Sequence, residues 1–140
     1  MFVFFLFSLA LGQISGTPVT VVAPIGVIVG VRDDLATSFL GIPFAEPPVA
    51  NLRWAEPVPK RPWNNSPLDA TKWGPGCPQT CQLPPLVCPA DTSEDCLQLN
   101  VFVPNDNANK QLLPVVVFLP GAVFFLFHRS LSNEFFSFFV

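Results

Sequence analysis

Charged and titratable side chains are scarce in this sequence. Only 12% of its 140 residues are charged, Tyr is absent, and ten acids against seven bases give a formal net charge of −3. The charges are scattered, without a run of Lys and Arg, and this excludes the basic surface that binds nucleic acid. There is a single histidine, His128, and because it stands among Phe residues we interpret it as incidental to any catalysis.

Hydrophobic residues make up half of the sequence and are unevenly distributed. Four of the 15 Phe residues lie in the first ten positions and seven follow Val123. A chain that is 50% hydrophobic does not have the composition of a disordered protein. We therefore divide it into a signal peptide at 1–16, one domain at 17–123, and a Phe-rich tail at 124–140 that does not continue the domain.

The first segment predicts export from the cell. Met1–Ala10 is an apolar run followed by small residues, as in a signal peptide and its cleavage site, although a basic start is missing. An uncleaved anchor or a core strand is the alternative. Asn64-Asn65-Ser66 is a sequence for N-glycosylation (a sequon), with Asn64 as the acceptor, and this suits a secreted protein. Pro67 lowers its expected occupancy, and a polar turn is the alternative.

The domain is predicted to begin with antiparallel strands. Val19–Val22 and Gly26–Val31 are β-branched runs on either side of a Pro-containing turn, and Thr37–Leu40 extends the meander. The prolines that follow, from Pro43 to Pro67, forbid regular structure. That stretch is predicted to be an ordered but irregular loop.

Two more strands are predicted downstream. Leu97–Val103 alternates apolar and polar residues, which indicates a strand with one mostly buried face. After a polar turn at Asn105–Lys110, the segment Leu112–Leu119 is apolar apart from one proline, as expected of a strand buried on both faces. No window has a convincing helical period.

Two stretches of the domain carry a family resemblance. Residues 39–54 read FLGIPFAEPPVANLRW, and residues 93–104 read SEDCLQLNVFVP. Together they resemble the two N-terminal signatures of the type-B carboxylesterase and cholinesterase-like family, whose members are secreted α/β-hydrolases. The resemblance implies an α/β fold class, with 17–123 as its N-terminal, β-rich and incomplete portion. It also implies a small-molecule carboxylic ester as the substrate of the parent family, and no cofactor.

Four cysteines cluster between Cys77 and Cys96. Their spacing lacks the paired short knuckles of a zinc ribbon, and an exported chain favours disulfides, so we expect no metal site. Four cysteines allow three pairings. The family resemblance implies the pair Cys77–Cys96, and this leaves Cys81 with Cys88.

The resemblance also implies an ion pair and one catalytic element. Arg53 and Glu94 match family positions that pair to hold the Pro-rich loop against the disulfide loop, with two solvated charges as the alternative. Gly121 matches the first glycine of the family's oxyanion hole. Ala122 and Val123 replace the glycines that follow, so this oxyanion hole is degenerate.

The residues that would perform ester hydrolysis are missing from the sequence. This chemistry needs a Ser on a Gly-x-Ser-x-Gly turn, a His base and an acid, and no Gly-x-Ser-x-Gly occurs. We therefore predict a fragment of a secreted carboxylesterase that is itself inactive. The alternative is a non-catalytic secreted binding or adhesion module. Membrane retention through Val115–Phe127 is disfavoured, because the run is short and is interrupted by Pro120.

Overall fold

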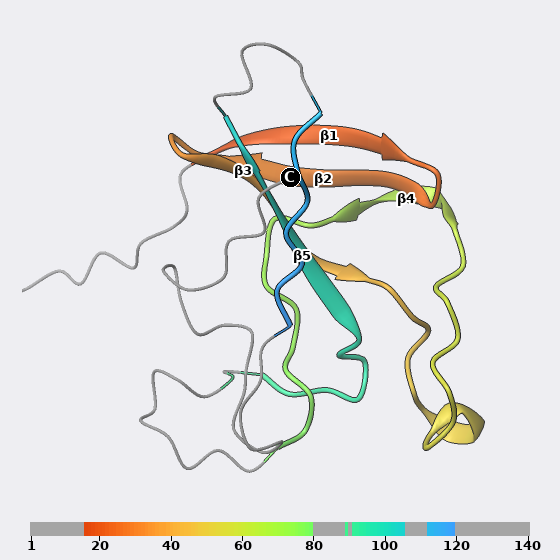
Figure 1. Cartoon of the computed structure of the whole chain (residues 1–140). Helices are drawn as coiled ribbons and strands as arrows, with labels where there is room; N and C mark the ends of the chain where they lie inside the picture. The colour runs from red at the N-terminus through yellow and green to blue at the C-terminus, as the bar shows by residue number, and fades with distance from the viewer. Residues whose placement is uncertain (1–15, 80–88, 90, 106–111, 120–140) are drawn as a thin grey trace, which may run out of the picture.

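A computed structural model of the chain describes residues 16–79, 89, 91–105 and 112–119 (Figure 1). Its regular elements, in chain order, are β1 (Thr17–Ala23), β2 (Gly26–Arg32), β3 (Ala36–Pro43), the 3-10 turn η1 (Ala50–Leu52), β4 (Trp63–Asp69) and β5 (Gln98–Pro104). No α-helix occurs in these ranges, and hence none that is long and apolar enough to cross a membrane.

The five strands form one sheet in the order β1-β2-β3-β5, with β4 joined to β2 off this path. Neighbours along the path are antiparallel, whereas β4 runs parallel to β2. β1 pairs along the whole of one side of β2, and β4 and β3 share the other side of β2. Its first half pairs with β4, and its last two residues, Val31 and Arg32, pair with β3.

The predicted hairpin of β1 and β2 is confirmed. The two strands pair without a break, from Thr17 with Arg32 to Ala23 with Gly26. Their Val, Ile and Thr residues favour the extended backbone. Gly26 closes the turn with a φ of 144°, and a Cβ there would collide with the indole ring of Trp63. The turn therefore needs glycine, because an aromatic ring from β4 packs against it.

The pairing of β3 with β5 contains a bulge at Gly41. Its register shifts between Phe39 and Ile42. Gly41 has a φ of 68°, and its N–H donates to Oδ1 of Asn100 at 2.9 Å. An added Cβ would lie 3.1 Å from the nitrogen of Gly74. Glycine is required here both for the left-handed backbone and for the close approach of the segment that follows β4.

β4 shows that the prediction of an entirely irregular loop from Pro43 to Pro67 is wrong. This stretch contains η1, and its end belongs to a strand that includes Pro67. The ladder with β2 steps from Trp63 directly to Leu68, so Pro67 stands at an irregularity where its missing N–H removes no ladder hydrogen bond. Pairing with β2 therefore makes a strand of residues that carry no strand signal of their own.

The hydrophobic core draws on all five strands. The buried hydrophobic residues are Ile28, Val31, Phe39, Leu40, Ala45 and Ala70, of which Ile28, Phe39 and Ala70 form one cluster. The partly buried hydrophobic residues packed against this cluster are Val19, Ala23, Ile42, Trp63, Leu68, Val101 and Val103. No single hairpin holds this core, so its burial depends on the assembled sheet.

Ala70, directly after β4, joins three strands. Its N–H donates to the carbonyl of Val29 in β2 at 2.7 Å, and its own carbonyl accepts from the N–H of Leu40 in β3 at 2.8 Å. Ala70 has no exposed surface, and Leu40 is 2% exposed. The Ala70 methyl group is therefore fully enclosed between the strands that Ala70 connects.

Thr37 is a buried polar residue of the sheet. Its hydroxyl accepts from Nε of Arg32 at 3.0 Å and donates to Oδ1 of Asn105 at 3.1 Å. Nδ2 of Asn105 in turn donates to the carbonyl of Asp33 at 2.8 Å. The buried hydroxyl is thus satisfied, and the chain after β5 is tied to the turn between β2 and β3.

The predicted burial of two segments differs from the structure. β5 is present as predicted, and Val101 and Val103 on its apolar face pack against the core, but they are only partly buried and Leu99 is 39% exposed. The segment 112–119 has no regular strand structure, and Leu119 at its end is 84% exposed. A strand buried on both faces needs paired neighbours and cover on each face. Within the described ranges no strand pairs with this segment and no helix covers it.

We expect Ala70→Val to destabilise the fold. The two added methyl groups have no free space at the junction of β2, β3 and β4, and overpacking of this kind costs about 1–3 kcal/mol. Urea unfolding followed by Trp fluorescence measures the change. Ala55→Val makes the same substitution at an exposed position and is the matched control. Equal unfolding midpoints for the two variants would contradict the junction described here.

Candidate functional site

The oxyanion-hole candidates lie outside the described residues. This holds for Gly121 and Ala122, and also for Cys81, Cys88 and His128. The described residues to which the sequence assigns a role are Cys77, Cys96, Arg53, Glu94 and, for its backbone, Asn64 in β4. Four of them come together beside the start of β5, and that region is the candidate site.

A disulfide bond joins Cys77 to Cys96, as predicted. The two sulfur atoms lie 2.00 Å apart and the two Cα atoms 5.1 Å apart. Beside it the backbone forms a bridge, in which Gly76 N–H donates to the carbonyl of Asp91 and Ser93 N–H donates to the carbonyl of Gly76, each at 2.9 Å. The segment that leads into β5 is therefore tied twice to the segment that follows β4, once covalently and once by backbone hydrogen bonds.

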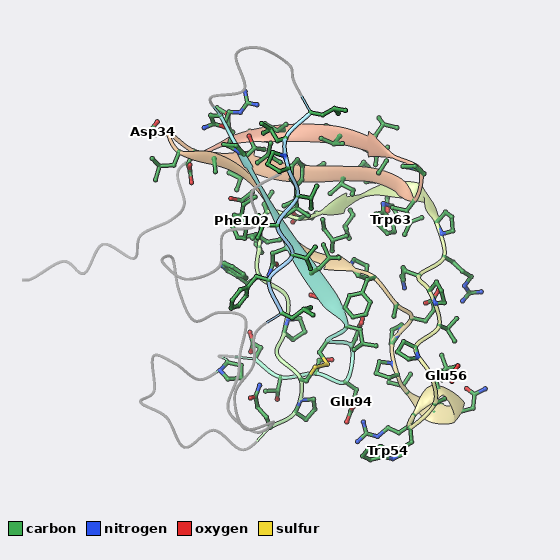
Figure 2. All side chains as sticks on the ribbon, viewed as in Figure 1. Asp34, Trp54, Glu56, Trp63, Glu94 and Phe102 are labelled. Carbon is green, nitrogen blue, oxygen red and sulfur yellow. A yellow bond between two sulfur atoms is a disulfide. The ribbon has the colours of Figure 1, made fainter. Side chains whose placement is uncertain are left out.

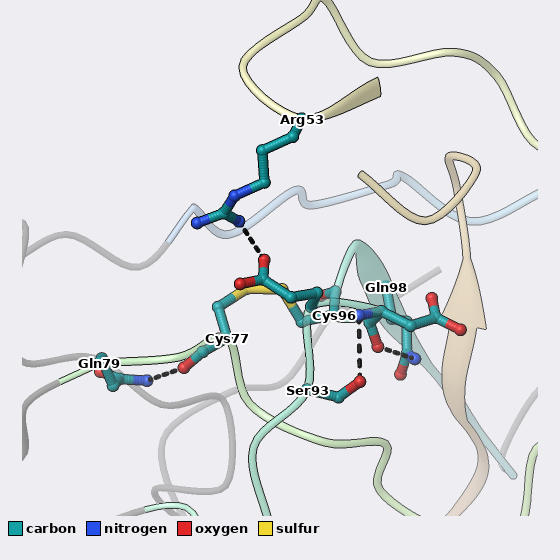
Figure 3. Close-up of a disulfide and its surroundings, with 8 residues drawn as sticks. Arg53, Cys77, Gln79, Ser93, Cys96 and Gln98 are labelled. Atoms are coloured by element: carbon teal, nitrogen blue, oxygen red, sulfur yellow. Dashed lines mark hydrogen bonds and ion pairs between the residues drawn. A yellow bond between two sulfur atoms is a disulfide. The ribbon is translucent and has the colours of Figure 1, made fainter. Parts of the chain in front are cut away.

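Arg53 and Glu94 are in contact next to this disulfide. Figure 3 shows the Arg53 side chain reaching toward the disulfide of Cys77 and Cys96, and its Nη1 donates to Oε2 of Glu94. The two side chains are 43% and 39% exposed. A pair this exposed contributes about 0–1 kcal/mol, so it orients the loop more than it stabilises the fold.

Trp54 projects from the same loop into solvent. It lies at the far end of the loop from the sheet (Figure 2), and it is 93% exposed. Its backbone has a φ of 60°, which is uncommon for an aromatic residue. The guanidinium carbon of Arg53 lies 4.8 Å from the centroid of the Trp54 ring. Arg53 therefore contacts a carboxylate and an aromatic ring at once.

Glu46 forms a second charged cluster, which sequence reasoning missed. Its Oε2 accepts from Nζ of Lys60 at 2.9 Å, and its Oε1 accepts from the backbone N–H and Nε of Arg61 at 3.1 and 3.0 Å. These hydrogen bonds, from Lys60 and then from Arg61, lower the pKa of Glu46 from 4.5 to about 2. The two limbs of the Pro-rich loop are thereby held together through one carboxylate. No local spacing rule connects an acid to bases this far along the chain.

The described residues that come together here form a structural scaffold. They include no group of three or more His, Cys, Asp or Glu side chains that could hold a metal ion. They include no His at all, and so no Ser–His pair. What this arrangement does chemically is to fix the Pro-rich loop and the disulfide loop relative to the sheet.

Comparisons with known proteins point to one family. A model of the carboxylesterase family matches residues 17–136. The chain is 45% identical over 105 residues to the cAMP-regulated D2 protein of Dictyostelium discoideum, a match that covers 74% of this chain and 19% of that protein. It is 49% identical over 90 residues to juvenile hormone esterase of Tribolium castaneum, covering 63% of this chain and 14% of that protein.

A solved structure of PNB esterase shares the fold. It superimposes with a TM-score of 0.68 at 38% identity, over 76% of this chain and 22% of that chain. The predicted fold class, the β-rich portion of an α/β-hydrolase, is therefore confirmed. The chain spans about a fifth of the length of these relatives. The family match runs past Val123, and the place where family-like sequence ends stays a prediction.

The Glu46 cluster predicts a specific dependence of stability on pH. A carboxylate with a lowered pKa adds stability that is complete above its ordinary pKa of 4.5 and is lost as the pH falls toward 2. We expect Glu46→Gln to be less stable than the unmodified chain at neutral pH, and the difference to shrink between pH 4.5 and 2. Thermal unfolding at several pH values measures it. Glu56→Gln removes an exposed charge from the same loop as a control, and a pH-independent difference for Glu46→Gln would disprove the assignment.

The second disulfide is predicted to join Cys81 to Cys88. With Cys77 bonded to Cys96, these are the remaining two of the four cysteines. Peptide mapping of non-reduced protein should recover one peptide pair joined through Cys81 and Cys88. Recovery of Cys77 joined to Cys81 as the main species would exclude this nested arrangement.

Proposed function

Since the chain belongs to the carboxylesterase family, we propose that it is the scaffold-forming part of a secreted carboxylesterase and does not hydrolyse esters by itself. Two facts taken together support the proposal. The family match covers residues 17–136, yet the sequence contains no Gly-x-Ser-x-Gly turn. The parent reaction is the hydrolysis of small-molecule carboxylic esters.

The reaction sets requirements that the sequence does not meet. A Ser hydroxyl must lose its proton to a His and attack the ester carbonyl, and an acid must orient that His. The oxygen of the tetrahedral intermediate must then be stabilised by backbone N–H donors. Gly121 supplies one glycine of the donor loop, but Ala122 and Val123 follow it. A β-branched Val resists the positive φ values that glycine adopts readily, and this is unfavourable to the donor geometry.

Secretion is the second part of the proposal. The Cys77–Cys96 disulfide supports it, because structural disulfides persist mainly in oxidising compartments. The apolar run Met1–Ala10 supports it as the core of a signal peptide. We propose the division made from the sequence, with the signal peptide at 1–16, the esterase-like domain at 17–123 and the Phe-rich tail at 124–140.

A non-catalytic secreted binding module is the second candidate. The observation in its favour is the exposed Trp54, stacked by Arg53 at the end of the Pro-rich loop. Phe44 and Val49 in the same loop are 47% and 46% exposed. Exposed aromatic side chains of this kind often anchor protein interfaces.

We expect the purified chain to hydrolyse a short-chain p-nitrophenyl ester no faster than the same protein after denaturation. The reason is the absence of a Ser elbow and of a suitable His base. Release of nitrophenol is followed by absorbance, with PNB esterase as the positive control. Reproducible turnover that a serine-directed phosphonate abolishes would show that the chain is an active enzyme.

A further inference from the structure

The sequon Asn64-Asn65-Ser66 lies where β4 leaves its ladder with β2. Trp63 pairs with Gly26, and the next pair along the ladder joins Leu68 to Ile28. β4 therefore carries more residues than β2 between the two pairs, and its residues 64–67 form a bulge. The sequon lies in this bulge.

Both ends of the bulge are anchored. Trp63 N–H donates to the carbonyl of Ile25, and its indole Nε1 donates to the carbonyl of Val27, each at 2.9 Å. Trp63 and Leu68 also pack against the core. Between these anchors Ser66 and Pro67 are exposed. The fold thus presents the second half of the sequon to solvent while its flanks stay fixed.

The outer edge of β4 is open at this position. Among the described strands β4 pairs only with β2 (Figure 1). Only beyond its end does the chain reach β3, where Ala70 accepts from Leu40. Within the described residues, no strand pairs with β4 on the side away from β2.

We propose that Asn64, in the bulge of β4, carries an N-linked glycan. The inference rests on the secretory localisation proposed above, because the donor is a lipid-linked oligosaccharide diphosphate of that pathway. The amide nitrogen of Asn64 bonds to the anomeric carbon of the sugar and loses a proton. The bond between that carbon and the lipid diphosphate breaks, and the diphosphate leaves with its electrons.

The position gives the glycan a function. An unpaired strand edge is a template for pairing with another chain, and natural proteins block such edges. A glycan is bulky and strongly solvated. On a residue of the bulge between the two ladder pairs, it hinders the approach of a second chain to β4.

Pro67 lowers the extent of glycosylation at Asn64, and the fold does not depend on Pro67. Proline restricts the residue before it, Ser66, to extended backbone, and this lowers the share of chains that the transferase can accept. Pro67 lies in the bulge and outside the ladder pairs. Pro67→Ala therefore leaves the ladder intact and raises occupancy.

Cell-free translation of residues 1–140 with endoplasmic reticulum microsomes tests the site. Chains protected from added protease have been translocated, and treatment with peptide N-glycosidase reveals a glycan as a loss of mass. We expect protected chains to carry one glycan, Pro67→Ala to increase the glycosylated share, and Asn64→Gln and Ser66→Ala each to abolish it. Asn65→Gln is the matched control, because it changes the neighbouring Asn and keeps the sequon.

The possible outcomes distinguish a failure of the glycosylation proposal from a failure of the proposed secretion. Protease-sensitive chains would count against secretion alone, and the assay is then repeated with a cleavable leader from a known secreted protein fused ahead of the whole chain. Protected chains without a glycan, in both the unmodified sequence and Pro67→Ala, would overturn the proposal. A glycan that persists in Asn64→Gln would overturn it as well.

Discussion

Two backbone hydrogen bonds at one alanine hold three strands of this sheet together. Ala70 donates to Val29 in β2 and accepts from Leu40 in β3, and it has no exposed surface. These two hydrogen bonds hold the chain after β4 against β2 and β3. In the sequence, the long Pro-rich loop separates those two strands from β4. Once both ends of that loop are fixed, its charged residues meet, and one carboxylate, Glu46, receives the bases that stand before β4. The loop is ordered by this closure and not by regular secondary structure.

The parts of the fold that sequence patterns could predict are those whose signal is local. The β1–β2 hairpin and β5 follow from β-branched and alternating residues. β4 could not be predicted, because its polar residues and Pro67 read as a loop and only the partner strand β2 makes them extended. The opposite error occurred at 112–119, whose apolar residues indicate burial. Burial on both faces also needs strands that pair with the segment and elements that cover each face, and a run of hydrophobic residues cannot supply these.

The contacts of the candidate site also divide into those that could be expected from the sequence and those that could not. The Cys77–Cys96 bond and the contact of Arg53 with Glu94 were expected only from a family resemblance, since four cysteines allow three pairings and charge positions alone assign no partners. The Glu46 cluster had no counterpart in that resemblance, and it depends on the closure of the loop. Long-range contacts of this kind become visible when the topology is known.

The pairing of β3 with β5 has a consequence for the order of folding. β1 and β2 are neighbours in sequence and can pair as soon as both are synthesised, whereas β3 must wait for a strand that follows a long intervening segment. Closing such a segment costs conformational entropy before its contacts form, so this step is slow. Cys96 stands just before β5, and the arrival of β5 beside β3 brings it to Cys77. The disulfide then forms only after the slowest pairing of the sheet has been made, and it holds β5 in place covalently.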